Sequence, residues 1–205
     1  MFVVTADQIA SSRGTDRVPA AFELLADLEP DLALPPDRNA GDELQLVTAS
    51  APTALDIVLR LRRDEHWSVG LGVGSVREPL ARSARESSGA AFLAARDAVD
   101  AAKRAPTRFS LVSAVDGRWN GGHVGALLDL LLALQGRRSP EGWAVVDLLR
   151  SGSNQLAAAE ALGITPQAVS LRLRAAGWRI EERARPALVL LLEDLDRGMS
   201  SPEQN

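Results

Sequence analysis

One stretch of sequence, SNQLAAAEALGITPQAVSLRLRAAGW at residues 153–178, constrains the fold of this chain more than any other. An asparagine or serine at its start can cap a short helix, and Gly163 can end it, because glycine adopts the left-handed conformation without a Cβ clash. Thr165 can then cap a second helix that has Pro166 at its first position. The stretch therefore predicts two short helices joined by a tight turn, a helix-turn-helix.

Each of the two predicted helices has a buried side and an exposed side. The expected core positions recur at helical spacing and are Leu156, Ala159 and Leu162 in the first helix and Val169, Leu173 and Ala176 in the second. The opposite side of the second helix carries Gln167, Leu171 and Arg174, with Ser170 and Arg172 on its flanks. These outward residues are the candidates for a functional surface.

The outward side chains are of the types that contact DNA. Gln and Arg can form two hydrogen bonds with a base edge, Leu can touch a thymine methyl group, and Ser and Arg suit phosphates. The predicted DNA-binding residues are Thr165, Gln167, Ser170, Leu171, Arg172, Arg174 and Arg179. The alternative is a plain helical hairpin with a solvated face, although such a face would more often carry Glu and Lys. Double-stranded DNA is the predicted partner.

The charge distribution favours a DNA-binding segment. The chain has a formal net charge of −4, yet residues 137–185 hold eight arginines against five acidic residues. A locally basic segment on an acidic protein is typical of a site-specific DNA binder rather than of a protein that coats nucleic acid indiscriminately. Arginines 183 and 185 extend the basic strip and could add phosphate contacts.

Composition limits the other functions open to this chain of 205 residues. Its apolar content of 46% suffices for a packed core. The absence of cysteine excludes disulfides and thiolate zinc sites, and two histidines are too few for a histidine-rich metal site. The most apolar stretches are short and contain acidic residues, and no targeting segment precedes the first strand. We therefore expect a cytoplasmic protein with no membrane partner.

The first 114 residues alternate between strand and helix patterns. Strands are expected at 2–6, 31–34, 44–48, 67–76 and 108–113, and helices at 18–28, 52–65 and from about residue 89. This order contains the split βαβ arrangement, with two helices on one face of the sheet, plus an extra helix and strand. We predict an α/β fold class in the form of an α+β ferredoxin-like domain, in which the first strand is central and pairs with the third. The glycines of WSVGLGVGSV indicate close approach by another backbone or a ligand.

A glycine-rich segment, DGRWNGG at residues 116–122, is the expected boundary between a domain at 1–114 and an all-α region at 115–200. Every later segment has helical periodicity, and the last helix is expected at 185–198. The helices at 123–135 and 185–198 are apolar around most of their circumference, which core packing or a dimer interface would bury. Because a helix-turn-helix reads a two-fold site best as a symmetric dimer, we favour a homodimer.

Carboxylates near two strand ends indicate a second candidate site. Asp7 follows the first strand, and NAGDELQLV places Gly41, Asp42 and Glu43 at the tip of a hairpin. A turn alone accounts for Gly and Asp, but the predicted topology also brings Asp42 toward Asp7. Two converging carboxylates repel each other, so we expect a cation beside them, either Mg²⁺ or an arginine. Mg²⁺ held in this way can receive a nucleoside triphosphate, and the amides of Gln8 to Ser12 could cradle its phosphates.

Over roughly residues 1–113 the chain resembles the SatD family, through the motifs ADQIASSR, GDELQ, VGLGVG and SSGAAFLAARDAV in that order. SatD proteins are in turn similar to the palm fold of class III nucleotidyl cyclases and GGDEF diguanylate cyclases. By that resemblance Asp7 and Asp42 correspond to the metal-binding aspartates, and Arg96 lies near an arginine that stabilises the transferring phosphate. The predicted nucleotide and metal site comprises Asp7, Gln8, Ser11, Ser12, Arg13, Gly41, Asp42, Glu43 and Arg96. Arg13 or Arg96 could instead neutralise Asp7 or Asp42.

The hairpin departs from the cyclase signature, because AGDEL stands in place of GGDEF. Ala40 replaces the first glycine and Leu44 the phenylalanine, so we favour retained binding of Mg²⁺ and a nucleotide over turnover, and we assign no catalytic residue. Cyclase activity and a purely structural relic are the alternatives. The downstream stretch AAAEALGITPQAVSLRLRAAG is similar to the helix-turn-helix of sigma-factor region 4 and of many bacterial one-component regulators.

The hypothesis that follows is a one-component transcription regulator. Its N-terminal domain would sense a purine nucleotide or a cyclic dinucleotide, and a dimeric helical domain would bind DNA. A metal-dependent nucleotidyl cyclase-like enzyme with a regulatory helical domain is the alternative from another class. A third hypothesis is a constitutive DNA binder whose N-terminal domain only dimerises.

Overall fold

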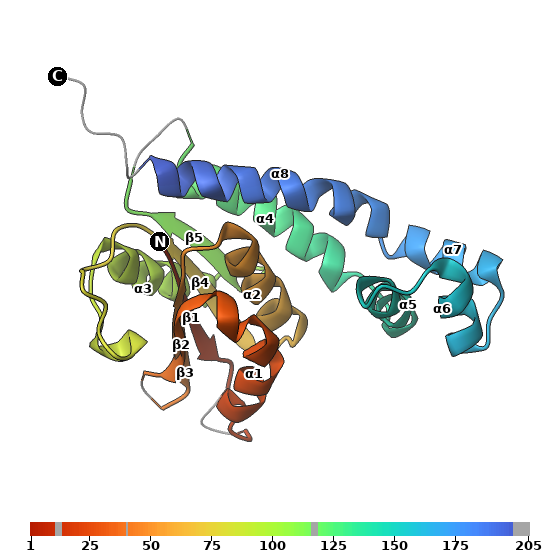
Figure 1. The fold of residues 1–205 in the computed structure, drawn as a ribbon, viewed down its shortest axis with the longest axis horizontal. Helices are drawn as coiled ribbons and strands as arrows, with labels where there is room; N and C mark the ends of the chain where they lie inside the picture. Colours follow the sequence, from red (N-terminus) through yellow and green to blue (C-terminus); the bar gives the residue numbers. More distant parts are fainter. Residues whose placement is uncertain (11–13, 40, 116–118, 199–205) are drawn as a thin grey trace. The chain divides into compact units, whose positions relative to one another are not determined.

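The computed structural model describes residues 1–10, 14–39, 41–115 and 119–198 (Figure 1). The first part of the chain forms a five-stranded sheet with the strand order β2-β3-β1-β4-β5. The strands are β1 (Phe2–Gln8), β2 (Leu32–Arg38), β3 (Glu43–Thr48), β4 (Trp67–Val73) and β5 (Phe109–Ser113). The helical part follows, so the predicted mixed α/β fold class is confirmed.

Strand β1 lies at the centre of the sheet. It pairs antiparallel with β3 on one side and with β4 on the other. β2 pairs antiparallel with β3 at one edge, and β5 pairs parallel with β4 at the other. This is the split βαβ order with one added helix and strand, and it confirms the predicted pairing of the first and third strands. Residues 2–6 of β1 are buried, as a central strand with covered faces requires.

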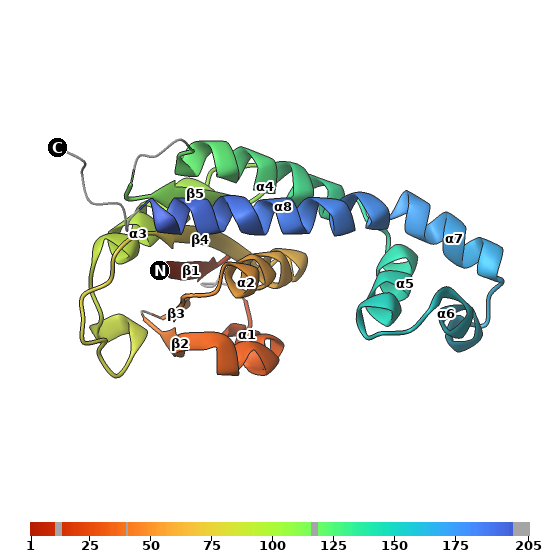
Figure 2. The same ribbon diagram turned by 45° about the horizontal axis from the view of Figure 1, so that its top comes forward.

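Helices cover both faces of the sheet. α2 (Ala51–Arg63) packs on β1 and β4 from one side, and α3 (Ala90–Ala102) packs on β4, β1 and β5 from the other (Figure 1, Figure 2). Successive side chains of a strand point to opposite faces, so Val3 and Val47, which are register partners, share the α3 face. They form a core cluster with Ala91 and Ala95 of α3.

Two glycines of β4 allow α3 to approach the sheet closely. A Cβ added to Gly70 would lie 2.2 Å from the backbone nitrogen of Val99. One added to Gly72 would lie 2.3 Å from backbone atoms of Ala91 and Ala95. No side chain fits at either position. The predicted close approach is confirmed, and the backbone of a helix makes it.

The segment before the hairpin differs in detail from the prediction. The helix expected at 18–28 is divided into α1 (Val18–Leu25) and a 3-10 helix, η2 (Ala26–Asp31). β2 is longer than expected, because it continues through Pro35 and Pro36. β2 is an edge strand, where a missing N–H need not remove a ladder hydrogen bond, so the prolines are tolerated.

The later elements are η3 (Ala84–Glu86), α4 (Gly121–Gly136), α5 (Pro140–Arg150), α6 (Gln155–Leu162), α7 (Pro166–Ala175) and α8 (Trp178–Arg197). The predicted start of the last helix at Arg185 was wrong, because α8 begins at Trp178 and runs through Pro186. A proline inside a helix removes one backbone N–H donor, but buried Glu181 before Pro186 and buried Leu188, Leu192 and Leu195 after it favour a continuous helix. None of the helices in the described ranges combines the length and apolarity that a bilayer-spanning segment requires.

By mutual contacts the chain divides into two compact units. The first unit contains residues 1–129 together with the chain from Leu188 onward, and the second unit contains residues 130–187. α4 and α8 each contribute residues to both units. This division by contacts does not test whether residues 1–114 and 115–200 fold as separate domains, so the boundary near residue 114 stays a prediction.

Candidate functional site

Local contacts fix each end of the helix-turn-helix in the second unit. The Asn154 side chain accepts a hydrogen bond from the amide three residues ahead at 2.9 Å and caps α6. Gly163 ends α6 in the left-handed conformation, with φ of 62°. The Thr165 hydroxyl oxygen accepts a bond from the amide three residues ahead at 3.2 Å, and Pro166 begins α7. The predicted caps, glycine and proline are confirmed.

A third helix, α5, completes the core around the helix-turn-helix, and it packs on both α6 and α7. The buried core residues are Val145, Val146, Ala159, Val169, Leu173 and Ala176. The predicted core positions of α7 are therefore confirmed. The packing role predicted for Leu156 was wrong, because its side chain is 60% exposed. Ala159 is buried in this core and Leu162 packs against it, as predicted, whereas Ala158 is buried and Leu156 lies on a different side of the helix.

The outward side of α7 and its flanks carry the residues predicted to contact DNA. Those that are exposed are Thr165, Gln167, Ser170, Leu171, Arg174 and Arg179, and Arg172 is half-buried. The Leu171 side chain is 59% exposed, which is a high value for a leucine in the middle of a helix. We call this set the α7 face. Its accessibility is established, and its contact with DNA stays a prediction.

A pocket of about 340 Å³ adjoins the α7 face. The residues that line it include Gln155, Ser170, Arg174, Arg179 and Ile180. Two guanidinium groups beside amide and hydroxyl donors suit a phosphate or another oxyanion. Gln155 was not among the predicted residues, although its place directly after a capping asparagine marks a helix N-terminus, which favours anions.

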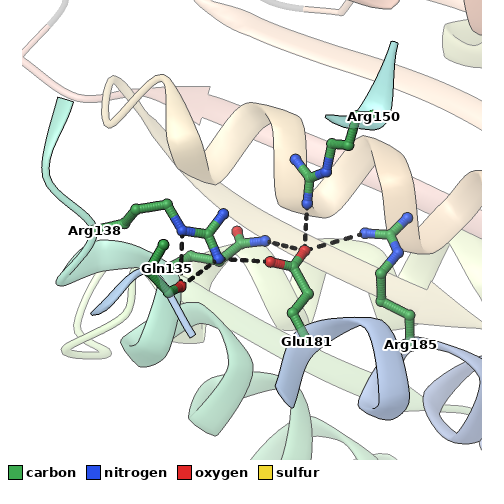
Figure 3. A network of polar contacts seen from close by, with 6 residues as sticks. Gln135, Arg138, Arg150, Glu181 and Arg185 are labelled. Atoms are coloured by element: carbon green, nitrogen blue, oxygen red, sulfur yellow. Dashed lines mark hydrogen bonds and ion pairs between the residues drawn. The ribbon is translucent and has the colours of Figure 1, made fainter. Parts of the chain in front are cut away.

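A buried ion cluster lies where α7 gives way to α8 (Figure 3). Glu181 of α8 is fully buried and accepts hydrogen bonds from Gln135 at 2.8 Å, from Arg138 at 2.7 Å and from Arg150. Arg185 adds an ion pair to Glu181 at 3.6 Å. Burial lowers the pKa of the Arg150 guanidinium below its ordinary value, despite the neighbouring carboxylate. In the sequence these arginines form only part of a locally basic segment, and the cluster was not predicted.

The second candidate site lies at one end of strands β1 and β3. The two strands pair so that Asp7 lies directly opposite Glu43, on the face of the sheet that α3 covers. Asp42 precedes Glu43 in the turn, so the acid in register with Asp7 is Glu43. Lys103 Nζ lies 3.0 Å from a carboxylate oxygen of Asp7, and a guanidinium nitrogen of Arg96 lies 4.0 Å from Glu43. Each of the two acids therefore has a cationic partner.

Helix α3 and its C-cap supply both cations. Arg96 and Lys103 are seven residues apart, which is about two turns of helix, so they project from one side. Lys103 was not among the predicted site residues, although its helical spacing from Arg96 could have identified it. Burial disfavours the charged Lys103, but hydrogen bonds to Asp7 and Asp100 outweigh it, so the pKa of Lys103 is raised above its ordinary value. The side chains of Arg96 and Lys103 are 60% and 40% exposed, so both can reach an incoming ligand.

Gln8 closes the loop that follows β1. Its side-chain amide donates to the carbonyl of Thr15 and accepts from the amide of Arg17, both at 2.9 Å. The backbone amides of Gln8 and Ile9 donate to protein carbonyls at 3.1 and 2.8 Å. These two amides of the predicted phosphate cradle are therefore already engaged. The remaining predictions for this region concern Ser11, Ser12, Arg13 and Ala40, which lie outside the described residues.

The carboxylates present match only part of a metal site. Among the described residues, no three His, Cys, Asp or Glu side chains are placed to hold a metal ion. Asp7 and Glu43 supply two carboxylates, and Mg²⁺ commonly takes one or two when phosphate oxygens and water complete its shell. The pair therefore fits a Mg²⁺-nucleotide complex if Lys103 and Arg96 exchange carboxylate for phosphate. Gly41, with φ of 52°, forms the hairpin tip beside them.

Comparison with known proteins assigns no family to the chain. No family model matches it, and no curated protein matches it. Among solved structures it is similar to the crystal structure of a regulator of polyketide synthase expression from Bifidobacterium adolescentis, with 15% sequence identity and a TM-score of 0.27. That alignment covers 96% of this chain and 79% of the other. The resemblances to SatD proteins and to sigma-factor region 4 therefore stay predictions from the sequence.

Proposed function

We propose that this protein binds specific sites on double-stranded DNA through the α7 face and regulates transcription there. The observation that carries the proposal is the α7 face itself. A capped helix of ten residues, held on a three-helix core, exposes Gln167, Ser170, Leu171 and Arg174 together. A helix presented in this way fits the major groove of B-form DNA.

The proposed contacts divide by chemistry. Gln167 and Arg174 have the paired groups that read base edges, and Leu171 suits a thymine methyl group. Thr165 retains its hydroxyl hydrogen for a phosphate, because its oxygen accepts the capping bond. The other phosphate contacts would come from Ser170, Arg172 and Arg179.

Fluorescence anisotropy with a labelled duplex, selected by the wild type from a random-sequence library, tests this proposal. The wild type should bind the selected duplex roughly a thousandfold or more tightly than a scrambled one. Gln167→Ala and Arg174→Ala should each weaken specific binding by about 5- to 150-fold. Arg104→Ala is the matched control, since it removes one exposed arginine from the first unit and should change little. Equal affinity for selected and scrambled duplexes would contradict the proposal.

We propose further that two copies of the chain bind one two-fold symmetric DNA site. Leu127 and Leu130 of α4 are 43% and 69% exposed, and Leu190 of α8 is 60% exposed. A second copy of the chain that covers these leucines would remove their apolar surface from water, which favours a dimer. Sedimentation of the wild type and of Leu130→Ser, at concentrations that saturate DNA, tests this step. A monomeric wild type on DNA would rule it out.

We propose in addition that the carboxylates of the first unit bind Mg²⁺ with a purine nucleotide or a cyclic dinucleotide. Support comes from Asp7, Glu43, Arg96 and Lys103, which place two carboxylates and two exposed cations at one end of the sheet. Phosphate groups would attract the two cations, and the carboxylates would then face the metal. Bound Mg²⁺ would neutralise phosphate charge. Asp42, in the turn next to Glu43, would supply a further carboxylate beside the metal.

Calorimetric titration with Mg²⁺ and a panel of purine nucleotides and cyclic dinucleotides tests the nucleotide site. Saturable binding by the wild type that is lost in Asp7→Asn supports it. Asp97→Asn, which neutralises an exposed acid elsewhere on α3, should bind normally. Metal-dependent release of pyrophosphate from ATP or GTP, abolished by Asp42→Ala, would favour the cyclase-like enzyme. Absence of any binding would leave a DNA-binding protein whose first unit has another role.

A further inference from the structure

Arg138 and Glu181 form a buried ion pair at the C-terminal end of the helix that bears the α7 face (Figure 3). Both side chains are fully buried, and Arg138 Nη2 lies 2.7 Å from Glu181 Oε2. Arg138 lies between α4 and α5, and Glu181 lies in the first turn of α8. The pair therefore joins parts of the second unit that are distant in sequence.

The same guanidinium group also holds the end of α7. Arg138 Nε and Nη2 donate to the carbonyl oxygen of Ala176, the C-cap residue of α7, at 3.0 and 2.8 Å. Carbonyl groups at a helix C-terminus lack partners within the helix, so a cation at that position stabilises the helix end. One arginine thus connects the last carbonyl of α7 to Glu181 of α8.

The surroundings of Arg138 leave little room for another geometry. A Cβ added to Gly142 would lie 3.1 Å from Arg138 Cγ and 3.4 Å from Ala176 Cβ. On another side, the guanidinium carbon lies 4.2 Å from the centre of the Trp143 ring, a cation–π contact. Gly177, with φ of 66°, then turns the chain from α7 into α8. Close packing and hydrogen bonds therefore fix this junction together.

Stability alone is a poor explanation for the cluster. Burying charged groups carries a desolvation cost that offsets most of their mutual attraction, and a well-packed apolar group would often serve as well. Three arginines around Glu181 also exceed what charge neutrality requires. A guanidinium group is planar and donates in fixed directions, so it specifies an orientation as well as a contact.

We propose that Arg138 and Glu181 are positioning residues for DNA recognition, which set the orientation of α7 relative to α5 and α8 without touching DNA. The inference rests on the DNA-binding function proposed above. Arg174 lies on α7 just before the anchored carbonyl, and Arg179 lies on α8 just after it. These two arginines also line the pocket beside the α7 face, so a shift of the junction would move its walls.

The variant Arg138→Lys of the full chain tests this role. Lysine keeps a positive charge beside Glu181 but lacks the planar fork that reaches both Glu181 and the Ala176 carbonyl. Glu181→Gln is a second variant, of nearly the same shape, which removes the other partner. Val145→Ala is the control, because it removes buried methyl groups from the same three-helix core without touching the cluster. Each variant is measured at the same number of degrees below its own melting temperature, so that differences in stability do not bias the comparison.

Two measurements are made on each protein. The first is the ratio of affinities for the selected and the scrambled duplex, and the second is amide hydrogen exchange over residues 176–181. Arg138→Lys should lower the affinity ratio by about tenfold or more, as expected when base-reading side chains are displaced. Its affinity for the scrambled duplex should stay within about twofold, because phosphate contacts tolerate such displacement. Exchange over residues 176–181 should rise, Glu181→Gln should behave alike, and Val145→Ala should show neither change.

An unchanged affinity ratio in Arg138→Lys and Glu181→Gln would overturn the proposal. An equal loss in Val145→Ala would also overturn it, since the ion pair would then act only through stability. If the wild type does not discriminate between duplexes, the proposed DNA-binding function fails and this inference fails with it. Hydrogen exchange separates the two failures, because it reports the anchor of α7 in the absence of DNA.

Discussion

The residues where β4 meets α3 are small on both sides of the contact. β4 supplies Gly70 and Gly72, and α3 presents Ala91, Ala95 and Val99 to them. Backbone then lies against backbone, and α3 is held close enough for Lys103, at its C-cap, to reach Asp7 at the end of β1. The glycines thus contribute to the candidate nucleotide site although they are not part of it.

Gly70→Ala should destabilise the first unit. The added methyl group would lie 2.2 Å from the backbone nitrogen of Val99, and a backbone cannot move aside as a flexible side chain can. We expect a loss of roughly 1–3 kcal/mol in the free energy of unfolding, measured by urea denaturation. Gly136→Ala is the control, since nothing lies within 4 Å of its added Cβ. Equal effects of the two substitutions would show that the close approach of α3 is not what the glycine serves.

The ion pair between Asp27 and Arg60 should make stability depend on acid pH. A hydrogen bond from Arg60 is the largest cause of the lowered pKa of Asp27. A carboxyl group whose pKa is lower in the folded state stabilises the fold above its ordinary pKa of 3.8, and this contribution is lost as pH falls through the folded pKa. Because the Asp27 side chain is 65% exposed, the contribution is limited to about 0.2–1 kcal/mol.

Thermal melts of the wild type and Asp27→Asn measure this contribution, from neutral pH down to the lowest pH at which both proteins are folded. The variant should melt slightly lower at neutral pH, and the difference should shrink as pH falls below the ordinary pKa. A difference that persists undiminished in acid would contradict the assignment to this ion pair.

At the scale of elements, α6 is too short to be stable by itself. Isolated helices of this length are marginal in water, so α6 depends on its cap and on α5 and α7. Asn154→Ala should therefore cost about 1 kcal/mol, and Asn154→Ser should retain most of the stability, because serine also caps well. Urea denaturation of the two variants measures the difference. Equal stabilities would mean that the capping bond to Asn154 contributes nothing.

Elements set by neighbouring residues could be predicted, and those set by distant contacts could not. The caps at Asn154 and Thr165, and the turn at Gly163, follow from local chemistry, and the sequence predicted all of them. The start of α8 was predicted too late because Pro186 usually marks a helix beginning, whereas tertiary burial decided the outcome. Distant contacts also explain why the prolines of β2 did not end that strand, because β2 is held by its pairing with β3.

The two candidate sites show the same limit. Strand register places Glu43, rather than Asp42, opposite Asp7, and a shift of one residue in register cannot be read from a single sequence. The Arg138–Glu181 pair joins residues 43 positions apart, and no periodicity relates them. The outward residues of α7 could be predicted because one helical wheel contains them all.

At the scale of the whole molecule, one chain carries a candidate nucleotide site in its first unit and a candidate DNA site in its second. If both sites bind, any effect of one ligand on the other is a coupling free energy. That coupling is reciprocal, because the four states of free, singly bound and doubly bound protein form a closed cycle. A nucleotide that favours DNA binding must therefore be bound more tightly by the DNA complex.

A nucleotide that binds the first unit should change the DNA affinity by about 5- to 150-fold, the usual range for allosteric coupling. Anisotropy titrations of the selected duplex, with and without Mg²⁺ and nucleotide, give one factor. Nucleotide titrations with and without saturating duplex give the other, and the two factors should agree. Asp7→Asn should abolish both while it leaves DNA affinity without nucleotide unchanged, whereas Arg174→Ala should weaken DNA binding but keep nucleotide binding. Binding at both sites with a coupling factor of one would mean that the nucleotide does not regulate DNA binding. A ligand that binds the free protein and the DNA complex equally tightly does not shift the equilibrium between them.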